Sequence, residues 1–130
     1  METHDIYSLF PQHADCIVYL EGLRWPGKPI CPYCKLTFTT PLRAERRHHC
    51  NVCNVPFSVM VGTLFHHTRL PLQKWFLAIH LVSGKIPARE LARSLGVNKN
   101  TASRISREIK RAWREPEQRT LLSEIINLHR

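Results

Sequence analysis

The sequence predicts a small α+β protein, in which an N-terminal helix and a segment of short antiparallel β-hairpins precede a domain of three helices. Two observations support this prediction. Four cysteines form two C-x2-C pairs, and the hydrophobic period changes from two residues to about 3.6 near residue 70. With 130 residues, the chain has room for one or two small domains. We expect a division into residues 1–66, residues 67–115 and a C-terminal helical tail over residues 116–130.

The composition is that of an ordinary folded protein. Hydrophobic residues make up 43% of the chain, and 5 glycines and 9 prolines are too few for a disordered or collagen-like sequence. No stretch approaches the roughly 20 apolar residues that a membrane span needs, and the first residues lack the pattern of a signal peptide. We therefore expect a cytoplasmic protein without a membrane partner. In a reducing compartment, we do not expect the five cysteines to form a disulfide framework.

Four of the cysteines have the spacing of a metal site. They follow the pattern C-x2-C-x15-C-x2-C and are Cys31, Cys34, Cys50 and Cys53. A C-x2-C pair brings two thiolates to one ion from a tight turn, and two pairs complete the tetrahedral shell of structural zinc. All four positions are then filled by protein, which leaves none for a catalytic water. The pattern predicts a zinc ribbon with one structural Zn²⁺.

The residues around the cysteines favour short strands. Residues 36–40 and 57–61 alternate apolar and polar side chains, and Pro41 is expected to end the first strand. Lys35 and Asn54 follow the second cysteine of each pair, where the backbone turns left-handed. A subdomain of about 35–40 residues buries too little apolar surface to fold alone. Zinc should therefore supply much of its folding free energy.

Two other interpretations of this segment compete with a zinc ribbon. A C-x-x-C redox pair is disfavoured, because two pairs occur without a doubly wound pattern around them. In the second interpretation, one of four nearby histidines replaces a thiolate as zinc ligand. Because four cysteines already saturate the ion, we expect these histidines at the surface or facing phosphate: His48, His49, His66 and His67. Cys16 lies apart in an apolar helical stretch and is expected to be a small buried hydrophobe.

The helical part begins near Leu70. Apolar residues recur at helical spacing from Leu72 to Val82, with Pro71 suited to the first turn and Gly84 to the end of a helix of about 12–14 residues. Because this helix is apolar on a wide face, we expect it to be the central helix of three. Trp75 and Phe76 are then core residues and do not stack on nucleobases.

The next segment has the spacing of a helix-turn-helix. Pro87 opens a first helix, Gly96 supplies a left-handed turn, Val97 fills the corner and Asn98 caps a second helix. The inner residues of the two helices are Leu91, Ala92, Leu95, Ala102, Ile105 and Ile109. A small residue, a glycine and an apolar plug at fixed offsets distinguish a DNA-binding helix-turn-helix from an ordinary helical hairpin.

Charge is concentrated in the same segment. Residues 85–114 contain nine Lys or Arg and two Glu, in a chain of net charge +9. A positive field of this kind attracts polyanions, and double-stranded DNA is the leading candidate. The expected DNA contacts are Asn98, Lys99, Asn100, Thr101, Ser103, Arg104, Arg107, Lys110 and Arg111. The alternative is a trihelical protein-interaction module with a basic solvent-exposed face.

Several strings resemble one family in combination. They are residues 15–26 (DCIVYLEGLRWP), 31–34 (CPYC), 57–59 (FSV), 62–65 (GTLF) and 68–79 (TRLPLQKWFLAI). Over about residues 8–115 the chain resembles the N-terminal region of bacterial insertion-sequence transposases of the DDE type, related to the eukaryotic Merlin elements. The resemblance implies that a zinc ribbon and a helix-turn-helix recognise transposon-end DNA ahead of a ribonuclease-H-type catalytic domain. It also implies that the four cysteines bind zinc and that residues 98–107 read DNA.

The chain departs from this family after the helices. The aspartates are Asp5 and Asp15, both before the cysteines, whereas two-metal phosphoryl transfer needs several carboxylates on a rigid scaffold. We therefore expect no transposase catalysis from this chain alone, and no small-molecule substrate. The apolar stripe of the tail either covers the helical core or forms a homodimer, which we favour slightly: Leu121, Leu122, Ile125, Ile126 and Leu128.

These observations lead to one functional hypothesis and two alternatives. The leading hypothesis is a zinc-dependent, sequence-specific DNA-binding protein of the nucleoid, acting as a transcriptional regulator or transposon-end binder. The first alternative is an adaptor whose ribbon binds protein and whose helices anchor it to DNA nonspecifically. The second is a non-catalytic fragment of a transposase. Substitution of Asn100 and Arg104 separates sequence reading from anchoring.

Overall fold

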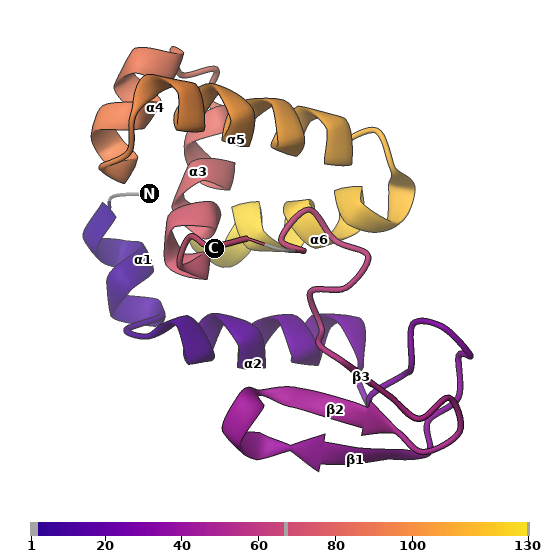
Figure 1. The fold of residues 1–130 in the computed structure, drawn as a ribbon. Coiled ribbons are helices and arrows are strands. Elements are labelled where there is room, and N and C mark those ends of the chain that lie inside the picture. Colours follow the sequence, from indigo (N-terminus) through magenta and orange to yellow (C-terminus); the bar gives the residue numbers. More distant parts are fainter. Residues whose placement is uncertain (1–2, 67, 130) are drawn as a thin grey trace.

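The computed structural model describes residues 3–66 and 68–129, and confirms the predicted α+β class (Figure 1). Two helices, α1 (Thr3–Leu9) and α2 (His13–Arg24), precede the strands β1 (Thr39–Leu42), β2 (Arg47–Cys50) and β3 (Val55–Phe57). Four helices follow: α3 (Leu72–Ser83), α4 (Ala88–Leu95), α5 (Lys99–Ala112) and α6 (Pro116–Ile126). Short 3-10 turns occur at Arg43–Glu45 and Asn127–His129. None of the described helices combines the length and apolar character that crossing a membrane requires.

Helix α3 is the centre of the helical part. It packs against α1, α2, α4, α5 and α6, and buries nearly all of its first two turns. Trp75 is 4% exposed and Phe76 is fully buried, which confirms both as core residues. Phe76 meets the ring of Phe10, the residue that follows α1, edge-to-face at 5.2 Å, a favourable aromatic geometry. One continuous core therefore joins the N-terminal helices to the helices that follow the sheet.

The apolar stripe of the tail belongs to this core. Leu121, Leu122 and Ile125 of α6 are buried, and α6 packs along α3. Of the two uses expected for the stripe, covering the helical core is the one that the fold adopts. The burial of these side chains stabilises α6 through transfer of apolar surface from water.

The sheet differs from the predicted strands in two places. Its order is β1-β2-β3, with both pairs antiparallel and Thr39 opposite Cys50. The first strand begins at Thr39, and Pro41 lies inside it instead of ending it. Proline is tolerated there because β1 is an edge strand, which leaves alternate N–H groups without a partner to bond.

The other difference concerns residues 57–61, which the alternating pattern predicts to be a strand. The observed strand, β3, already ends at Phe57. The chain then turns, with the Val61 N–H bonded to the Ser58 carbonyl at 3.3 Å. The Arg24 guanidinium donates hydrogen bonds to the carbonyl oxygens of Val59 and Val61, at 2.5 and 2.8 Å. Because a distant arginine occupies these acceptors, alternation alone gave the wrong extent for this strand.

The turn positions behave as predicted. Lys35 and Asn54 have φ of 66° and 60°, and their N–H groups bond the carbonyls of Cys31 and Cys50. Gly96, with φ of 69°, ends α4, in a conformation that costs glycine least. The Asn98 side chain accepts the Thr101 N–H at 2.8 Å and so caps α5. The pair of helices predicted over residues 88–112 is therefore present with its turn and cap.

Leu122→Ala tests whether α6 is part of the core. Leu122 is fully buried, so we expect its truncation to lower the free energy of unfolding by about 2–5 kcal/mol through lost burial and a residual cavity. Val18→Ala is the control, because Val18 is 67% exposed and should change stability by about 0.5 kcal/mol or less. Urea denaturation of both variants gives the comparison. Equal stabilities would contradict the packing of α6.

His13 makes the fold sensitive to pH. Its Nδ1 accepts the N–H of Leu72 at 3.0 Å, at the first turn of α3, so the ring must be unprotonated at that atom. Burial, and then the charge of Arg46, lower the pKa of His13 below its ordinary 6.5. The unfolded chain therefore takes up the proton first. This contribution to stability is complete above about pH 6.5 and is lost as the pH falls towards the lower pKa of the folded state.

His13→Asn isolates this effect, because the Asn side-chain oxygen can accept the same N–H without titrating. Between pH 7.5 and 5.5 we expect the melting temperature of the variant to fall less than that of the parent. We expect acid release of zinc to affect both proteins equally, because His13 is not a zinc ligand, so the difference between the two curves is the measurement. Parallel curves would show that His13 does not titrate in this range.

Candidate metal centre and nucleic-acid interface

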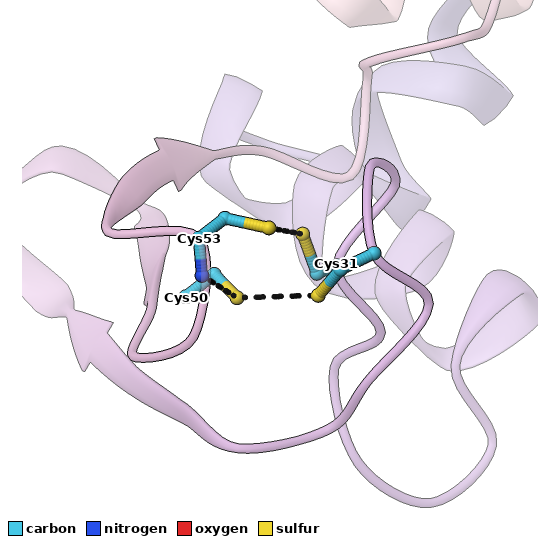
Figure 2. A group of neighbouring side chains, drawn as sticks. Cys31, Cys50 and Cys53 are labelled. Atoms are coloured by element: carbon cyan, nitrogen blue, oxygen red, sulfur yellow. Dashed lines mark hydrogen bonds between the residues drawn. The ribbon is translucent and has the colours of Figure 1, made fainter.

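The two C-x2-C turns bring four sulfur atoms together. All four Sγ atoms lie within 4.8 Å of one another, with 4.0 Å between Cys31 and Cys53 and 3.6 Å between Cys34 and Cys50. A tetrahedron with Zn–S bonds of about 2.3 Å has edges of about 3.8 Å. Figure 2 shows Cys50 and Cys53 of one turn facing Cys31 of the other. The cluster therefore fits one four-coordinate Zn²⁺ bound entirely by thiolates.

Local hydrogen bonds prepare the sulfur atoms for a cation. The N–H groups of Cys53 and Val52 lower the pKa of the Cys50 thiol to about 7, with the Cys53 N–H 3.3 Å from the sulfur. The neighbouring Cys34 sulfur, followed by burial, raises the pKa of Cys53 to about 12. Four adjacent thiols therefore cannot all ionise at neutral pH unless a cation lies between them. A structural Zn²⁺ supplies that charge, and four protein ligands leave it no position for a reacting water.

His48 anchors the ribbon to the helices, contrary to the predicted surface role. Its side chain is 13% exposed, and Nε2 lies 2.8 Å from a carboxylate oxygen of Glu21 on α2. Trp25 packs edge-on against both His48 and Phe57, at 5.4 and 5.7 Å between ring centroids. The ring is buried because β2 turns it towards α2, which sequence spacing does not reveal.

The other histidines also lie outside the metal cluster. His49 is half-buried and its Nε2 lies 2.9 Å from the Asn54 side-chain oxygen, at the second cysteine turn. His66 is exposed, and His67 lies outside the described residues. Within residues 3–66 and 68–129, the group of side chains at metal-binding distance consists of cysteines alone. Cys16 is fully buried in α2, as predicted, and burial raises the pKa of its thiol to about 12.

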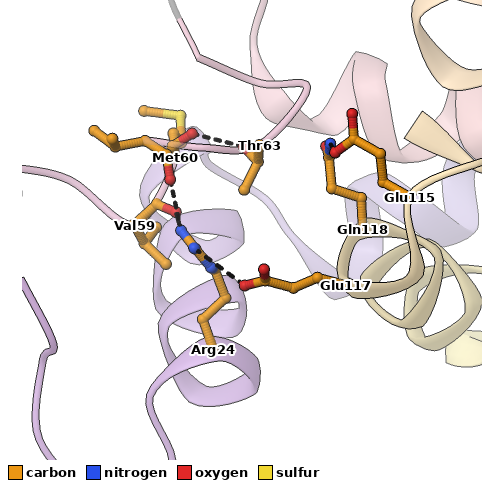
Figure 3. Close-up of polar contacts among 8 residues, drawn as sticks. Arg24, Val59, Met60, Thr63, Glu115, Glu117 and Gln118 are labelled. Carbon is orange, nitrogen blue, oxygen red and sulfur yellow. Dashed lines mark hydrogen bonds and ion pairs between the residues drawn. The ribbon is translucent and has the colours of Figure 1, made fainter. Parts of the chain in front are cut away.

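Arg24 connects three parts of the fold. Its guanidinium binds two carbonyls of the segment after β3 and lies 3.7 Å from Glu117 of α6 (Figure 3). Since Glu117 is 88% exposed, the ion pair adds little, and the two charge-assisted hydrogen bonds are the stronger contacts. Arg24 thus fixes the path from the sheet to the helices.

Helix α5 presents the residues expected to contact DNA. Seven of the nine are exposed: Asn98, Lys99, Asn100, Arg104, Arg107, Lys110 and Arg111. Thr101 and Ser103 are half-buried, and the Thr101 N–H is taken by the cap. The opposite side of α5 is buried through Ala102, Ile105 and Ile109. One helix therefore has a core-facing stripe and a polar, basic stripe.

The exposed stripe of α5 is strongly positive. Asn100, Arg104, Arg107 and Arg111 are spaced three or four residues apart and so follow one another along the helix surface. Glu108 is the acidic residue of this helix, and it lies 3.6 Å from Arg111. Arg89 and Arg93 on α4 are also exposed and extend the positive surface to the neighbouring helix.

Sequence reasoning missed a second basic segment. Arg43, Arg46 and Arg47 lie at the turn between β1 and β2, beside a shallow hollow of about 210 Å³ that Val18 of α2 also lines. Three arginines in five residues were a visible signal, but it was hidden within a weakly charged half of the chain. The pairing of Glu21 with His48 had no such signal, because it joins residues 27 positions apart.

Replacing one ligand tests the metal centre. In Cys31→Ser we expect the zinc content to fall well below one ion per chain and the ribbon to unfold, because zinc supplies the folding free energy of this segment. Elemental analysis and circular dichroism give the two measurements. Cys16→Ala is the matched control and should keep one zinc. Full zinc content in Cys31→Ser would rule out the four-cysteine site.

Comparison with known proteins finds similarity over part of the chain. Residues 11–55 match the model of the transposase zinc-ribbon domain. An uncharacterized protein in transposable element ISH50 of Halobacterium salinarum is 29% identical over 101 residues, which cover 75% of this chain. The chain spans about a third, 34%, of the length of that relative. No solved structure matches.

The domain match and the sulfur geometry agree residue by residue. The matched segment contains α2, the sheet up to the start of β3, and all four clustered cysteines. The resemblance to transposases predicted from the sequence is confirmed over this segment. Residues 11–55 are therefore similar to a transposase zinc-ribbon domain, and their four cysteines fit one structural Zn²⁺.

Proposed function

We propose that this chain is a zinc-dependent, sequence-specific protein that binds double-stranded DNA, related to the DNA-recognition region of a transposase. The observation that carries the proposal is the exposed stripe of α5, where amide and guanidinium side chains stand on a helix held rigidly by its buried side. In this proposal α4 and α5 are a helix-turn-helix, and α5 enters the major groove.

The positions along α5 suggest separate tasks. Asn100 and Arg104 lie in its first half, where a recognition helix meets base edges, and these side chain types make bidentate contacts to adenine and guanine. Lys110 and Arg111 lie in the last turn, where contact with phosphate is expected. The cap by Asn98 and the packing of α5 on α3 fix the helix before DNA binds, which lowers the entropic cost of recognition.

The role of the zinc ribbon in this proposal is to support recognition without catalysis. Its ligands are all protein thiolates, and the described residues bring no cluster of carboxylates together for two-metal chemistry. The protein would act by occupying its site, as a transposon-end binder or a transcriptional regulator in the cytoplasm. Its similarity to a protein in a transposable element favours the end-binding role.

Two alternatives make different predictions. As an adaptor, the chain would bind a protein through the ribbon and hold all DNA sequences equally through its basic helices. As a non-catalytic fragment of a longer transposase, it would still select the transposon end. The apolar stripe of α6 that suggested a homodimer is largely buried within the chain, so it no longer supports that hypothesis. Sedimentation at micromolar concentration tests that hypothesis independently.

Selection from random duplexes, followed by affinity measurements on the selected site, tests sequence reading. We expect Asn100→Ala and Arg104→Ala each to weaken the selected site by about 1–3 kcal/mol and to relax the preference at one base position. Lys110→Ala should instead weaken all duplexes similarly and reduce the steepness of the salt dependence by about one unit.

Arg69→Ala is the charge-matched control, because Arg69 is exposed but lies outside α4 and α5. It should leave both the selected motif and its affinity nearly unchanged. If Asn100→Ala and Arg104→Ala bind every duplex as the parent does, α5 does not read sequence. An affinity that is flat against salt would remove DNA as the partner.

A further inference from the structure

The zinc-binding end of the ribbon exposes an unusual group of apolar side chains. Phe38 is 67% exposed, whereas the other four phenylalanines are at most 6% exposed. Tyr33, between the cysteines of the first pair, is 61% exposed. Two aliphatic residues at the same cysteine turns are also exposed, and we call the four residues the aromatic patch: Tyr33, Leu36, Phe38 and Val52. Large apolar side chains exposed on one pair of adjoining turns mark a candidate interaction site.

The patch is held rigidly by the metal-binding turns. Tyr33 donates its N–H to the Cys31 sulfur at 3.4 Å, and the Leu36 carbonyl accepts the Cys31 N–H at 3.0 Å. The Phe38 carbonyl accepts the N–H of Asn51, next to Val52, at 2.9 Å. Each backbone segment of the patch is thus tied to a cysteine turn. Because the backbone is already ordered, a partner that binds the rings does not have to order it.

The charge around the patch favours an anionic partner. Residues 25–57 contain five Lys or Arg and one Glu, so the ribbon stays positive even after the net −2 of a zinc bound by four thiolates. Lys35 is exposed between Tyr33 and Phe38 in the sequence, and Lys28 is exposed just before the first cysteine pair. Exposed rings flanked by cations are the combination that binds unpaired bases, through stacking and phosphate contacts.

The ribbon also lies away from the proposed reading helix. In Figure 1 the sheet is at one end of the molecule and α5 at the other, with α2 and α6 between them. A duplex bound to the exposed stripe of α5 therefore leaves the aromatic patch free. A partner of the patch would therefore bind separately from that duplex.

We propose that the aromatic patch binds single-stranded DNA, with unpaired bases stacked on Tyr33 and Phe38 and phosphates near Lys28 and Lys35. This activity goes beyond the proposed reading of duplex DNA and uses a separate surface. The protein then holds a duplex at one end and an unpaired strand at the other, a combination suited to DNA ends that open. An acidic protein partner is the competing occupant, and the experiment below separates the two.

The probes are a labelled (dT)20 and an abasic strand of the same length and charge, with binding to the full zinc-loaded chain followed by fluorescence anisotropy. The parent should bind (dT)20 more tightly than the abasic strand, because only (dT)20 has bases to stack. Tyr33→Ala and Phe38→Ala should each weaken (dT)20 binding by about 5- to 150-fold and leave the abasic strand unchanged. Tyr33→Phe keeps the ring and should bind (dT)20 as the parent does.

Tyr7→Ala is the matched control, since Tyr7 is an exposed aromatic residue on α1. Zinc content of one ion per chain verifies that each variant retains a folded ribbon. Equal affinity of the parent for (dT)20 and the abasic strand, or unchanged (dT)20 binding by the Tyr33→Ala, Phe38→Ala double variant, would overturn the proposal and leave a protein as the occupant. Arg104→Ala should weaken the selected duplex but not (dT)20, so failure of either proposal is visible separately.

Discussion

The ribbon depends on one constraint, which is that four thiolates take the place of a hydrophobic core. Between Cys31 and Phe57, those two residues and Cys50 are the buried apolar side chains. Two strands of four residues and one of three cannot offset the conformational entropy of ordering this segment. Convergence of four sulfurs on Zn²⁺ supplies what burial does not, and it fixes both cysteine turns at the same time.

The metal fixes the ribbon internally, and different contacts fix it to the rest of the chain. Trp25 and Phe57 close around His48, which reaches Glu21, and Arg24 binds the carbonyls of the segment that leaves the sheet. These contacts all involve the last turn of α2 and the residue that follows it. Helix α2 therefore transmits the position of the ribbon to α3, against which it packs. The ribbon is mounted on the helical core instead of hanging from a linker.

This mounting gives the molecule two ends with different surfaces. Amide and guanidinium side chains on α5 suit the edges of paired bases, whereas the exposed rings of the ribbon suit the faces of unpaired ones. Both ends are positively charged, so either end attracts polyanions. In the two proposals, the side chain type and the rigidity of the element that carries it distinguish the partner of each end.

Features that depend on local geometry or spacing can be predicted from the sequence. These are the thiolate ligands, the left-handed turns at Lys35 and Asn54, the span of α3, and the turn and cap between α4 and α5. Each follows from chemistry within a few residues, or from a helical period that repeats over several turns. Tertiary structure alone decided that β3 ends at Phe57, that His48 is buried, that α6 covers α3 and that Phe38 stays exposed. Those outcomes depend on partners far away in the chain, such as Arg24 for the carbonyls after β3 and Glu21 for His48, and no local pattern encodes them.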